Sequence, residues 1–415
     1  MKRIEPANMT KEEALLHYKQ MELDSLLQVT DAINRNDSAI DLYKIYGFIL
    51  KAQLRLQRLV IFYNDDKEWE CAHHYGLEQV PKDKLIMTEE WFDHRDPVFL
   101  TETPIEPIQQ YFEVLMPVYH KDNPLAFVLL GHLENNSPET KEARLNFIQT
   151  ITNIIIVAIE NKRLFRKQIQ QERMTKELEV ARKVQTMLIP DVLPNNDHLN
   201  LSAIYIPHYN IGGDYYDVFH ISEHEILACI ADVSGKGISA ALLMSNFQAL
   251  IKVLAKENIG LVDLVKKLNE RVEEITKGER FITLFLATYN LQTRVLKYIN
   301  AGHPPPLLFH KDAKDLIELT SGCTLIGAFD KLPSITEGTI TIPPKSNLVM
   351  YTDGLSDVVN EADEYFEEKN LHEFILQQTS EDSKALNDSL LAYLDRFKGT
   401  RQYTDDISIL SWEFN

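Results

Sequence analysis

Four short acidic segments in the second half of the chain hold the residues best suited to chemistry. They read GGDYYD at 212–217, ADVSGKG at 231–237, YTDG at 351–354 and TDDIS at 404–408. The last three follow or adjoin apolar runs typical of strands, so we expect their carboxylates at strand ends. Carboxylates gathered in this way, without enough nearby Lys or Arg to neutralise them, require a cation. Because neither Cys nor clustered His accompanies them, the oxygen ligands favour Mg²⁺ or Mn²⁺ over zinc.

Several neighbouring side chains have both a structural and a functional interpretation, which the sequence leaves open. Asp217 and Asp357 are either outer carboxylates of the site or capping and solvated acids. Lys236 either meets a phosphate or lies in solvent. His303, in a proline-rich turn, is either structural or a general acid. Either Asp405 or Asp406 could be the metal ligand in the last segment.

The composition limits what the chain can be. Its 415 residues exceed one ordinary hydrophobic core, so we expect two domains and a connecting segment. The net charge of −19 would repel a phosphate backbone, and we expect no nucleic-acid partner. Cys71, Cys229 and Cys323 are too few and too far apart for a disulfide framework or a zinc cluster, which fits a reducing compartment.

No segment has the pattern of a secretory signal or a membrane span. Residues 1–8 contain Lys and Arg, but no apolar run follows them. The longest uninterrupted apolar stretch, at 154–159, is far too short to cross a bilayer. We therefore expect a cytoplasmic protein that does not enter a membrane.

The first part of the chain has the pattern of a small α+β domain behind a helical extension. We expect the extension at 1–23 and the domain at 24–160, with apolar residues at helical spacing over 40–56. Turn-forming residues at 121–124 separate the last two strands. The expected strands lie at 58–63, 68–73, 111–118 and 126–132.

This order of helix, strand pair, variable middle, strand pair and closing helix resembles a GAF domain. The resemblance implies a sensory module that takes a small-molecule signal, a protein signal or no ligand. Cys71 is read as a small core residue rather than a chromophore or redox site. Because His73 and His74 are neighbours on a strand, they point to opposite faces and cannot easily chelate one ion. We assign no ligand.

Residues 140–188 have a helical pattern without Pro or Gly, and we assign 161–190 as a helical, coiled-coil linker. One stripe either packs on the C-terminal domain, or the helix is a dimerising transmitter whose register can shift. The second hypothesis predicts a homodimer formed through the GAF-like domain and the linker. The two heptad core positions hold Leu164, Gln171, Leu178 and Gln185, and Lys167, Met174, Ala181 and Leu188. A competing stripe contains Phe165, Ile169, Val180, Val184 and Met187.

The C-terminal domain, assigned to 191–415, contains many short apolar runs in succession. Antiparallel strands with segregated helices predict an α+β architecture in layers, whereas parallel βαβ alternation does not fit. Helices are expected at 238–257, 260–275, 369–378 and 383–397. Strands are expected at 201–206, 216–221, 226–232, 281–290, 295–300, 307–310, 339–342, 348–351 and 407–413.

The motifs in this half resemble those of the metal-dependent PPM protein phosphatases. The order GGDYYD, ADVSGKGISAALLM, NAGHPPPLL, YTDGLSD and TDDIS is similar to their bacterial SpoIIE-like branch, which includes the RsbU-type regulators. The helical segment at 178–190 also resembles the lead-in of that branch. The resemblance covers about 175–415. Each motif alone is weak, but five in the expected order are specific.

The resemblance implies an α/β/β/α sandwich of two antiparallel sheets with a centre of two Mg²⁺ or Mn²⁺ ions at one edge. By motif, Asp214, Asp232, Asp353 and Asp405 are the catalytic metal ligands, and the carbonyl of Val233 assists. Asp232 is expected to bridge the ions. In the last motif, TDDIS, the family pattern makes the first acid, Asp405, the metal ligand instead of Asp406. Water activated by two metals would then hydrolyse the ester directly.

The activity implied is hydrolysis of phosphoserine or phosphothreonine on a signalling protein. In this branch the usual substrates are phosphorylated STAS-domain proteins, the anti-sigma-factor antagonists. A non-catalytic scaffold on the same fold is the alternative, although all four expected ligands are present. A diguanylate cyclase fits poorly, because the GGDEF signature needs an acid where Tyr215 stands. The phosphatase motifs at 353 and 405 would also stay unexplained.

Overall fold

The protein was studied as a computed structural model, which describes residues 10–65, 68–81, 85–132, 140–196, 199–208, 211–257, 259–377 and 382–415. The chain divides into two compact units, Met1–Glu172 and Arg173–Asn415. The division falls inside the segment predicted to be a linker. Each unit has its own hydrophobic core. The predicted α+β class is confirmed.

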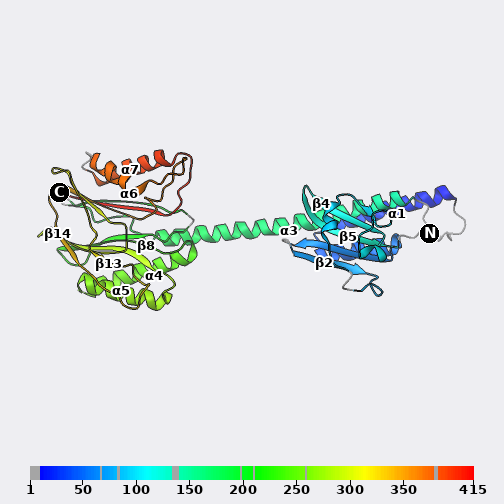
Figure 1. Cartoon of the computed structure of the whole chain (residues 1–415), viewed down its shortest axis with the longest axis horizontal. Coiled ribbons are helices and arrows are strands. Elements are labelled where there is room, and N and C mark those ends of the chain that lie inside the picture. Colours follow the sequence, from blue (N-terminus) through cyan, green and yellow to red (C-terminus); the bar gives the residue numbers. More distant parts are fainter. Residues whose placement is uncertain are drawn as a thin grey trace. The chain divides into compact units, whose positions relative to one another are not determined.

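The first unit is built on one antiparallel sheet with the strand order β2-β1-β5-β4-β3 (Figure 1). All four predicted strands are present, but Asn123 and Pro124, predicted to lie in a turn, begin a strand instead. The GAF assignment itself stays a prediction. The strands are β1 (Arg58–Asp65), β2 (Glu68–Tyr75), β3 (Val98–Phe99), β4 (Val114–His120) and β5 (Asn123–Gly131).

Three helices cover one face of this sheet: α1 (Lys11–Asn34), α2 (Ala39–Phe48, continued by the π-turn η2, Ile49–Gln53) and α3 (Lys141–Thr186). They share one apolar core with the strands. On the other face, the short 3₁₀ helices η4 (Glu89–Asp93) and η5 (Ile108–Gln110) contribute to a smaller core.

The helix α1 continues across the predicted boundary at residue 23 without a break. The helix begins at a capping box, in which Thr10 and Glu13 each accept from the other's main-chain N–H. Val29 and Ala32, in its second half, are fully buried in the core of the first unit. The helix is thus anchored where its apolar face meets the sheet.

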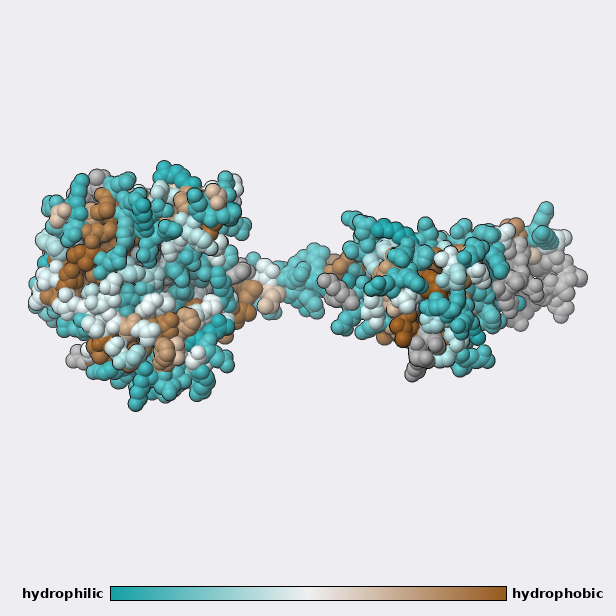
Figure 2. Space-filling model, viewed as in Figure 1, coloured by the Kyte–Doolittle hydropathy of each residue, from teal (hydrophilic) through white to brown (hydrophobic). Residues whose placement is uncertain are grey.

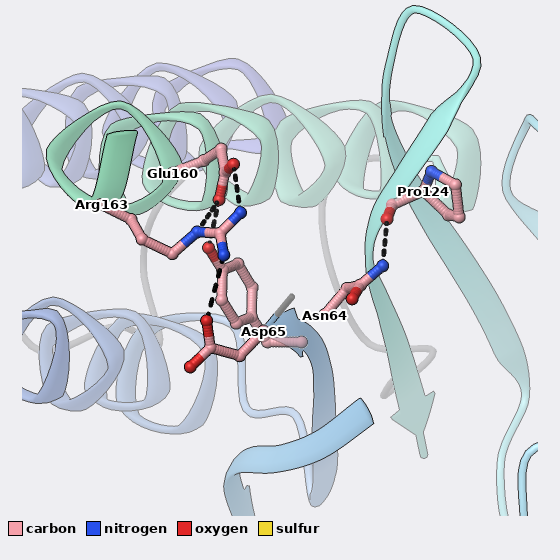
Figure 3. Close-up of polar contacts among 6 residues, drawn as sticks. Asn64, Asp65, Pro124, Glu160 and Arg163 are labelled. Atoms are coloured by element: carbon pink, nitrogen blue, oxygen red, sulfur yellow. Dashed lines mark hydrogen bonds and ion pairs between the residues drawn. The ribbon is translucent and has the colours of Figure 1, made fainter. Parts of the chain in front are cut away.

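A buried polar cluster fixes α3 to the sheet near the end of the first unit (Figure 3). Glu160 on α3 accepts hydrogen bonds from the hydroxyl of Tyr63 on β1 and from the Arg163 guanidinium. Arg163 also pairs with Asp65 at 3.1 Å. Because Glu160 is buried, its charge depends on these partners. Burial, followed by the hydrogen bond to Glu160, raises the pKa of Tyr63, so its hydroxyl stays a donor.

The second unit is a sandwich of two mainly antiparallel sheets. One has the order β13-β10-β9-β8-β7, with β14 also paired to β10, and the other the order β12-β11-β15-β16-β6. The first sheet contains β7 (Tyr215–His220), β8 (Glu225–Val233), β9 (Ile282–Asn290), β10 (Val295–Ala301), β13 (Gly322–Cys323) and β14 (Gly338–Thr341). The second contains β6 (Leu199–Ile206), β11 (Leu307–His310), β12 (Asp315–Glu318), β15 (Ser346–Tyr351) and β16 (Ile407–Phe414).

Two pairs of helices enclose the sandwich (Figure 1). The helices α4 (Ile238–Leu254) and α5 (Leu261–Thr276) pack on the first sheet, and their core continues between the sheets. The helices α6 (Glu367–Gln377) and α7 (Ser383–Lys398) share a separate core with the outer face of the second sheet. The predicted α/β/β/α layers are confirmed. The weakly patterned strands β12 and β13 were missed.

The segment Ile238–Glu257, comprising α4 and the turn η6 (Ala255–Glu257), is long and apolar enough to cross a membrane by those two criteria alone. No other helix in the part of the chain that the structure describes satisfies both. Its buried side, which includes Met244 and Phe247, packs in the core of the second unit. That packing is typical of a core helix in a globular unit.

Apolar residues of both linker stripes are exposed on α3. Phe165 and Val184 of the competing stripe are 63% and 57% exposed, and Leu164 of the heptad is 50% exposed. These three side chains are exposed in the single chain, and both hypotheses about the stripes stay predictions. Gln185, assigned to a heptad core position, is instead buried within the second unit.

The Glu160 cluster predicts a large difference between two substitutions. Glu160→Ala should destabilise the first unit by about 2–3 kcal/mol, because it leaves the Arg163 charge partly buried beside an unpaired Tyr63 hydroxyl. Asp65→Ala should cost less than about 1 kcal/mol, since Asp65 is largely exposed. Hydrogen exchange of β1 and α3 in increasing urea measures both. Equal effects would contradict this account of the cluster.

Candidate metal centre

The four candidate ligands lie where strands of both sheets end. Asp214 precedes β7 and Asp232 is the second-last residue of β8, in the first sheet. Asp353 follows β15 and Asp405 precedes β16, in the second sheet. Hydrogen bonds connect the two sides, because Thr352 beside β15 donates to Asp214 at 2.8 Å. The sandwich thus brings these segments together at one end.

Asp214 is the most deeply buried of the four, with a residue exposure of 1%. One of its carboxylate oxygens, Oδ2, accepts from Thr352 Oγ1 and, at 2.7 Å, from Ser408 Oγ of β16. Burial, followed by the charges of Asp232 and Asp406, raises the pKa of Asp214 well above its ordinary value. Both donors come from the second sheet, so they orient an acid of the first sheet across the junction.

Asp232 lies among the other acids. Burial, followed by the charges of Asp353 and Asp405, raises its pKa to about 7, and a hydrogen bond with Asp214 opposes the shift. The two carboxylates can form that hydrogen bond only if one is protonated. A shared proton therefore relieves a repulsion that a bound cation would also relieve.

Asp353 and Asp405 complete the group on the second-sheet side. Burial and then the charges of Asp357 and Asp405 raise the pKa of Asp353. Asp405 pairs with Lys236 Nζ at 2.7 Å, and Lys236 also donates to the carbonyl of Thr404 at 3.0 Å. Lys236 is therefore neither a purely solvated lysine nor, here, free for phosphate.

Asp405 and Asp406 differ in their main-chain contacts. Asp406 accepts from the backbone N–H groups of His208 at 2.8 Å and Gly213 at 2.7 Å. It thereby holds the loop that carries Asp214. A Cβ on Gly212 would lie 2.4 Å from Asp406 Oδ2, so the loop needs glycine there. Asp406 therefore has a supporting contact to this loop, whereas the charge of Asp405 acts on both Asp232 and Asp353.

Gln185, near the end of α3, binds the same loop from the opposite direction. Its side-chain amide donates to the carbonyl of Gly212 at 2.7 Å and accepts from the Gly212 N–H at 3.2 Å. The linker helix is thus joined to the main chain two residues before Asp214. The only sequence signal was an amide at an apolar heptad position.

Two other candidates lie outside the group of four. Asp217 accepts from the hydroxyl of Tyr215 at 2.6 Å and pairs with Lys252 of α4 at 2.8 Å, so its role is structural. His303 is buried and its Nδ1 lies 2.9 Å from Thr283 Oγ1. Burial lowers the pKa of His303 to about 3, so it is neutral near pH 7 and poorly suited to act as a general acid.

The donor set fits a hard divalent cation. Among the residues that the structure describes, no three His, Cys, Asp or Glu side chains form a ready-made metal cluster. The carboxylates nevertheless lie close enough to raise one another's pKa, and Val233 O lies 2.9 Å from the Cβ position of Gly213. Their excess negative charge is what a divalent ion would neutralise.

Comparison with known proteins identifies the second unit. Residues 222–415 match the family model described as Stage II sporulation protein E (SpoIIE). Phosphoserine phosphatase RsbU of Bacillus subtilis is 28% identical over 305 residues, which cover 71% of this chain and 89% of RsbU. Phosphoserine phosphatase RsbP of the same organism is 27% identical over 186 residues, covering 44% of this chain and 45% of RsbP.

A solved structure agrees with this assignment at the level of the fold. The SiaA-PP2C domain of Pseudomonas aeruginosa superposes with a TM-score of 0.53 at 19% identity, covering 59% of this chain and 99% of that domain. The match to the family model, the similarity to RsbU and the shared fold agree. The second unit has the PP2C fold and is similar to the SpoIIE-type phosphatase domains, which supports its assignment as a protein serine/threonine phosphatase.

Proposed function

We propose that this chain hydrolyses phosphoserine or phosphothreonine on a signalling protein, and that Asp214, Asp232, Asp353 and Asp405 would hold two metal ions that supply an activated water. The observation that carries the proposal is the approach of Asp214, Asp232, Asp353 and Asp405 at one end of the sandwich. No covalent intermediate is required. The alternative is a non-catalytic scaffold, which would have no need to keep these mutually repelling acids together.

Each acid has a role in this proposal. Two Mg²⁺ or Mn²⁺ ions, when bound, would supply an activated water and charge to stabilise the phosphoryl oxygens. Asp232 lies between the acids of the two sheets and would bridge the ions, with the Val233 carbonyl assisting. Asp214 would bind from the first sheet, and Asp353 and Asp405 from the second. Thr352 and Ser408 would keep Asp214 oriented.

We infer that the substrate is a phosphorylated STAS-domain protein of the anti-sigma-factor antagonist class. We propose that the reaction takes place in the cytoplasm. The support is the similarity to RsbU, a phosphoserine phosphatase. That similarity covers more residues than the second unit contains, so it extends into the segment before Arg173. The relationship therefore includes part of the chain that would regulate the enzyme.

Regulation would pass through α3. We propose that the GAF-like unit receives a small-molecule or protein signal, and that α3 joins two copies of the chain through its exposed apolar stripes. Gln185 connects this helix by two hydrogen bonds to the loop that precedes Asp214. Movement of the last turn of α3 would then shift a metal ligand, and with it the activity.

The first prediction tests catalysis. Asp232→Asn should lower Mn²⁺-dependent release of phosphate from a phosphoserine protein by at least about 1,000-fold, because it removes the bridging charge. Asp263→Asn, which changes an exposed acid on α5, should leave the rate within about twofold. Full activity of Asp232→Asn would refute the site. An inactive wild-type protein would favour the scaffold.

The second prediction concerns the protein without metal. Because the folded-state pKa of Asp232 is about 7 and the ordinary value is 3.8, the folded state binds more protons between these pH values. The free energy of unfolding should therefore fall as pH rises from about 4 to about 7. Asp232→Asn lacks this ionisation and should be more stable than wild type at pH 7.5 by about 2 kcal/mol.

Thermal or urea unfolding in a chelator at pH 5 and pH 7.5 measures this difference. Saturating Mg²⁺ or Mn²⁺ should reverse the ranking, since only the wild type keeps the full set of ligands. A stability difference that is independent of both pH and metal would contradict the electrostatic account of Asp232.

The third prediction tests Gln185. Gln185→Ala removes two hydrogen bonds, each contributing about 1 kcal/mol, so the half-saturating Mn²⁺ concentration should rise roughly 5- to 30-fold. Gln170→Ala, an exposed residue on the same helix, is the control and should leave it unchanged. Calorimetric titration of Mn²⁺ into the full chain measures both. Unchanged metal binding in Gln185→Ala would exclude this contact from controlling the loop.

A further inference from the structure

Arg280 is a basic residue beside the candidate metal centre that the sequence motifs do not identify. It precedes β9, which pairs with β8 so that Thr283 lies opposite Asp232. The pairing continues beyond the strands, because Ser234 N donates to the Phe281 carbonyl at 2.9 Å. Arg280 therefore lies about three residues, or roughly 10 Å along the strand direction, from the level of Asp232.

The main chain around Arg280 is held firmly. Phe281 N donates to Ser234 Oγ at 2.9 Å, and Thr276 Oγ1 donates to the Arg280 carbonyl at 3.1 Å. The side chain therefore starts from a fixed point beside the loop that follows Asp232. That loop continues into the N-terminus of α4, where Gly237 provides no side-chain cap.

Gly235 provides the space that the guanidinium occupies. A Cβ on this residue would lie 2.0 Å from Arg280 Nη1, and the backbone has a φ of +93°, a conformation that favours glycine. Nη1 also donates to the Ser234 carbonyl at 3.3 Å. The loop is thus shaped so that an arginine can lie against it.

Arg280 differs from Lys236 on the same loop. Lys236 is paired with Asp405, whereas Arg280 is exposed and forms no ion pair with any residue described in the structure. The remaining N–H groups of its guanidinium are available to an anion. Two oxygens of a phosphate match the fork of a guanidinium.

The charge of the metal centre and of the substrate suggests a role for the Arg280 guanidinium. Asp214, Asp232, Asp353 and Asp405 carry four negative charges when ionised, which two divalent ions balance, and Lys236 adds one positive charge beside Asp405. A phosphoserine adds a further charge of about −1.5 to −2 near neutral pH. A guanidinium at the rim would strengthen the attraction for this added charge.

We propose that Arg280 binds the phosphate group of the substrate. This assignment deepens the phosphatase function proposed above and rests on it. The guanidinium would contact non-bridging phosphoryl oxygens at the side of the centre formed by the loop 234–237. The ligand chemistry is that of a phosphate monoester, and inorganic phosphate, the product, is the simplest probe.

The test compares Arg280→Gln, Arg280→Lys and Arg271→Gln in the full chain. Arg271 is an exposed arginine on α5 paired with Glu274, and serves as the control. Isothermal titration of inorganic phosphate into the Mg²⁺-loaded protein measures binding without turnover. Hydrolysis of p-nitrophenyl phosphate with Mn²⁺ gives KM and kcat. Titration of Mn²⁺ reports whether the metal site is intact.

Arg280→Gln should weaken phosphate binding by about tenfold or more and raise KM by a similar factor, with a smaller change in kcat. Its Mn²⁺ affinity should stay unchanged. Arg280→Lys should recover part of the loss, and Arg271→Gln should match wild type. Phosphate affinity and KM within twofold of wild type in Arg280→Gln would overturn the assignment while leaving the phosphatase function intact.

The binding measurement separates the two proposals. If the wild-type protein binds phosphate through Arg280 but releases none from a phosphomonoester or a phosphoprotein, the hydrolytic function fails and the Arg280 assignment stands. If the Mg²⁺-loaded wild type binds no phosphate, the assignment is overturned directly.

Discussion

Electrostatic repulsion among carboxylates at the junction of two sheets is the constraint on which the second unit depends. Asp214 and Asp232 are contributed by one sheet, and Asp353 and Asp405 by the other, so closing the sandwich brings like charges together. Apolar burial between the sheets opposes this cost, because both inner faces and α4 and α5 share one core. The fold thus holds in place a charge arrangement that is unfavourable without a cation.

The polar contacts around these acids keep the site ordered without neutralising it. Thr352 and Ser408 donate to Asp214 from the second sheet. The Asp406 carboxylate accepts from the main-chain N–H of Gly213 and so fixes the loop before Asp214. Among the residues that the structure describes, Lys236 alone contributes a direct positive partner, and it pairs with Asp405. Neutral donors orient a carboxylate yet leave its charge available to a metal. Support of this kind agrees with a site prepared for cations.

Much of the fold could be predicted from the sequence because the strands are short, apolar and bounded by turns. The predicted strand at 307–310 coincides with β11, and the long helix at 140–188 differs from α3 by one or two residues at each end. β12 and β13 were missed because Asp315–Glu318 is mostly exposed and Gly322–Cys323 is only two residues long. Their positions depend on pairing with distant strands.

The candidate site was predictable in part for a similar reason. The acids stand in motifs whose order is specific, but their supports are contacts between distant segments. The distinction between Asp405 and Asp406 depends on which main-chain N–H groups each one meets, and sequence spacing does not contain that information. Arg280 and Gly235 are 45 positions apart, and their fit follows from the pairing of β8 with β9.

The contact between Gln185 and Gly212 has a consequence for how such domains could vary. Both hydrogen bonds join the Gln185 side chain to main-chain atoms of the loop, so the contact depends on the position of the backbone and not on a loop side chain. Side chains elsewhere in the loop could therefore change during evolution without a matching change in the helix. The helix in turn could be exchanged for another that presents an amide at the same place. A connection of this type would let the same C-terminal domain be joined to different N-terminal domains.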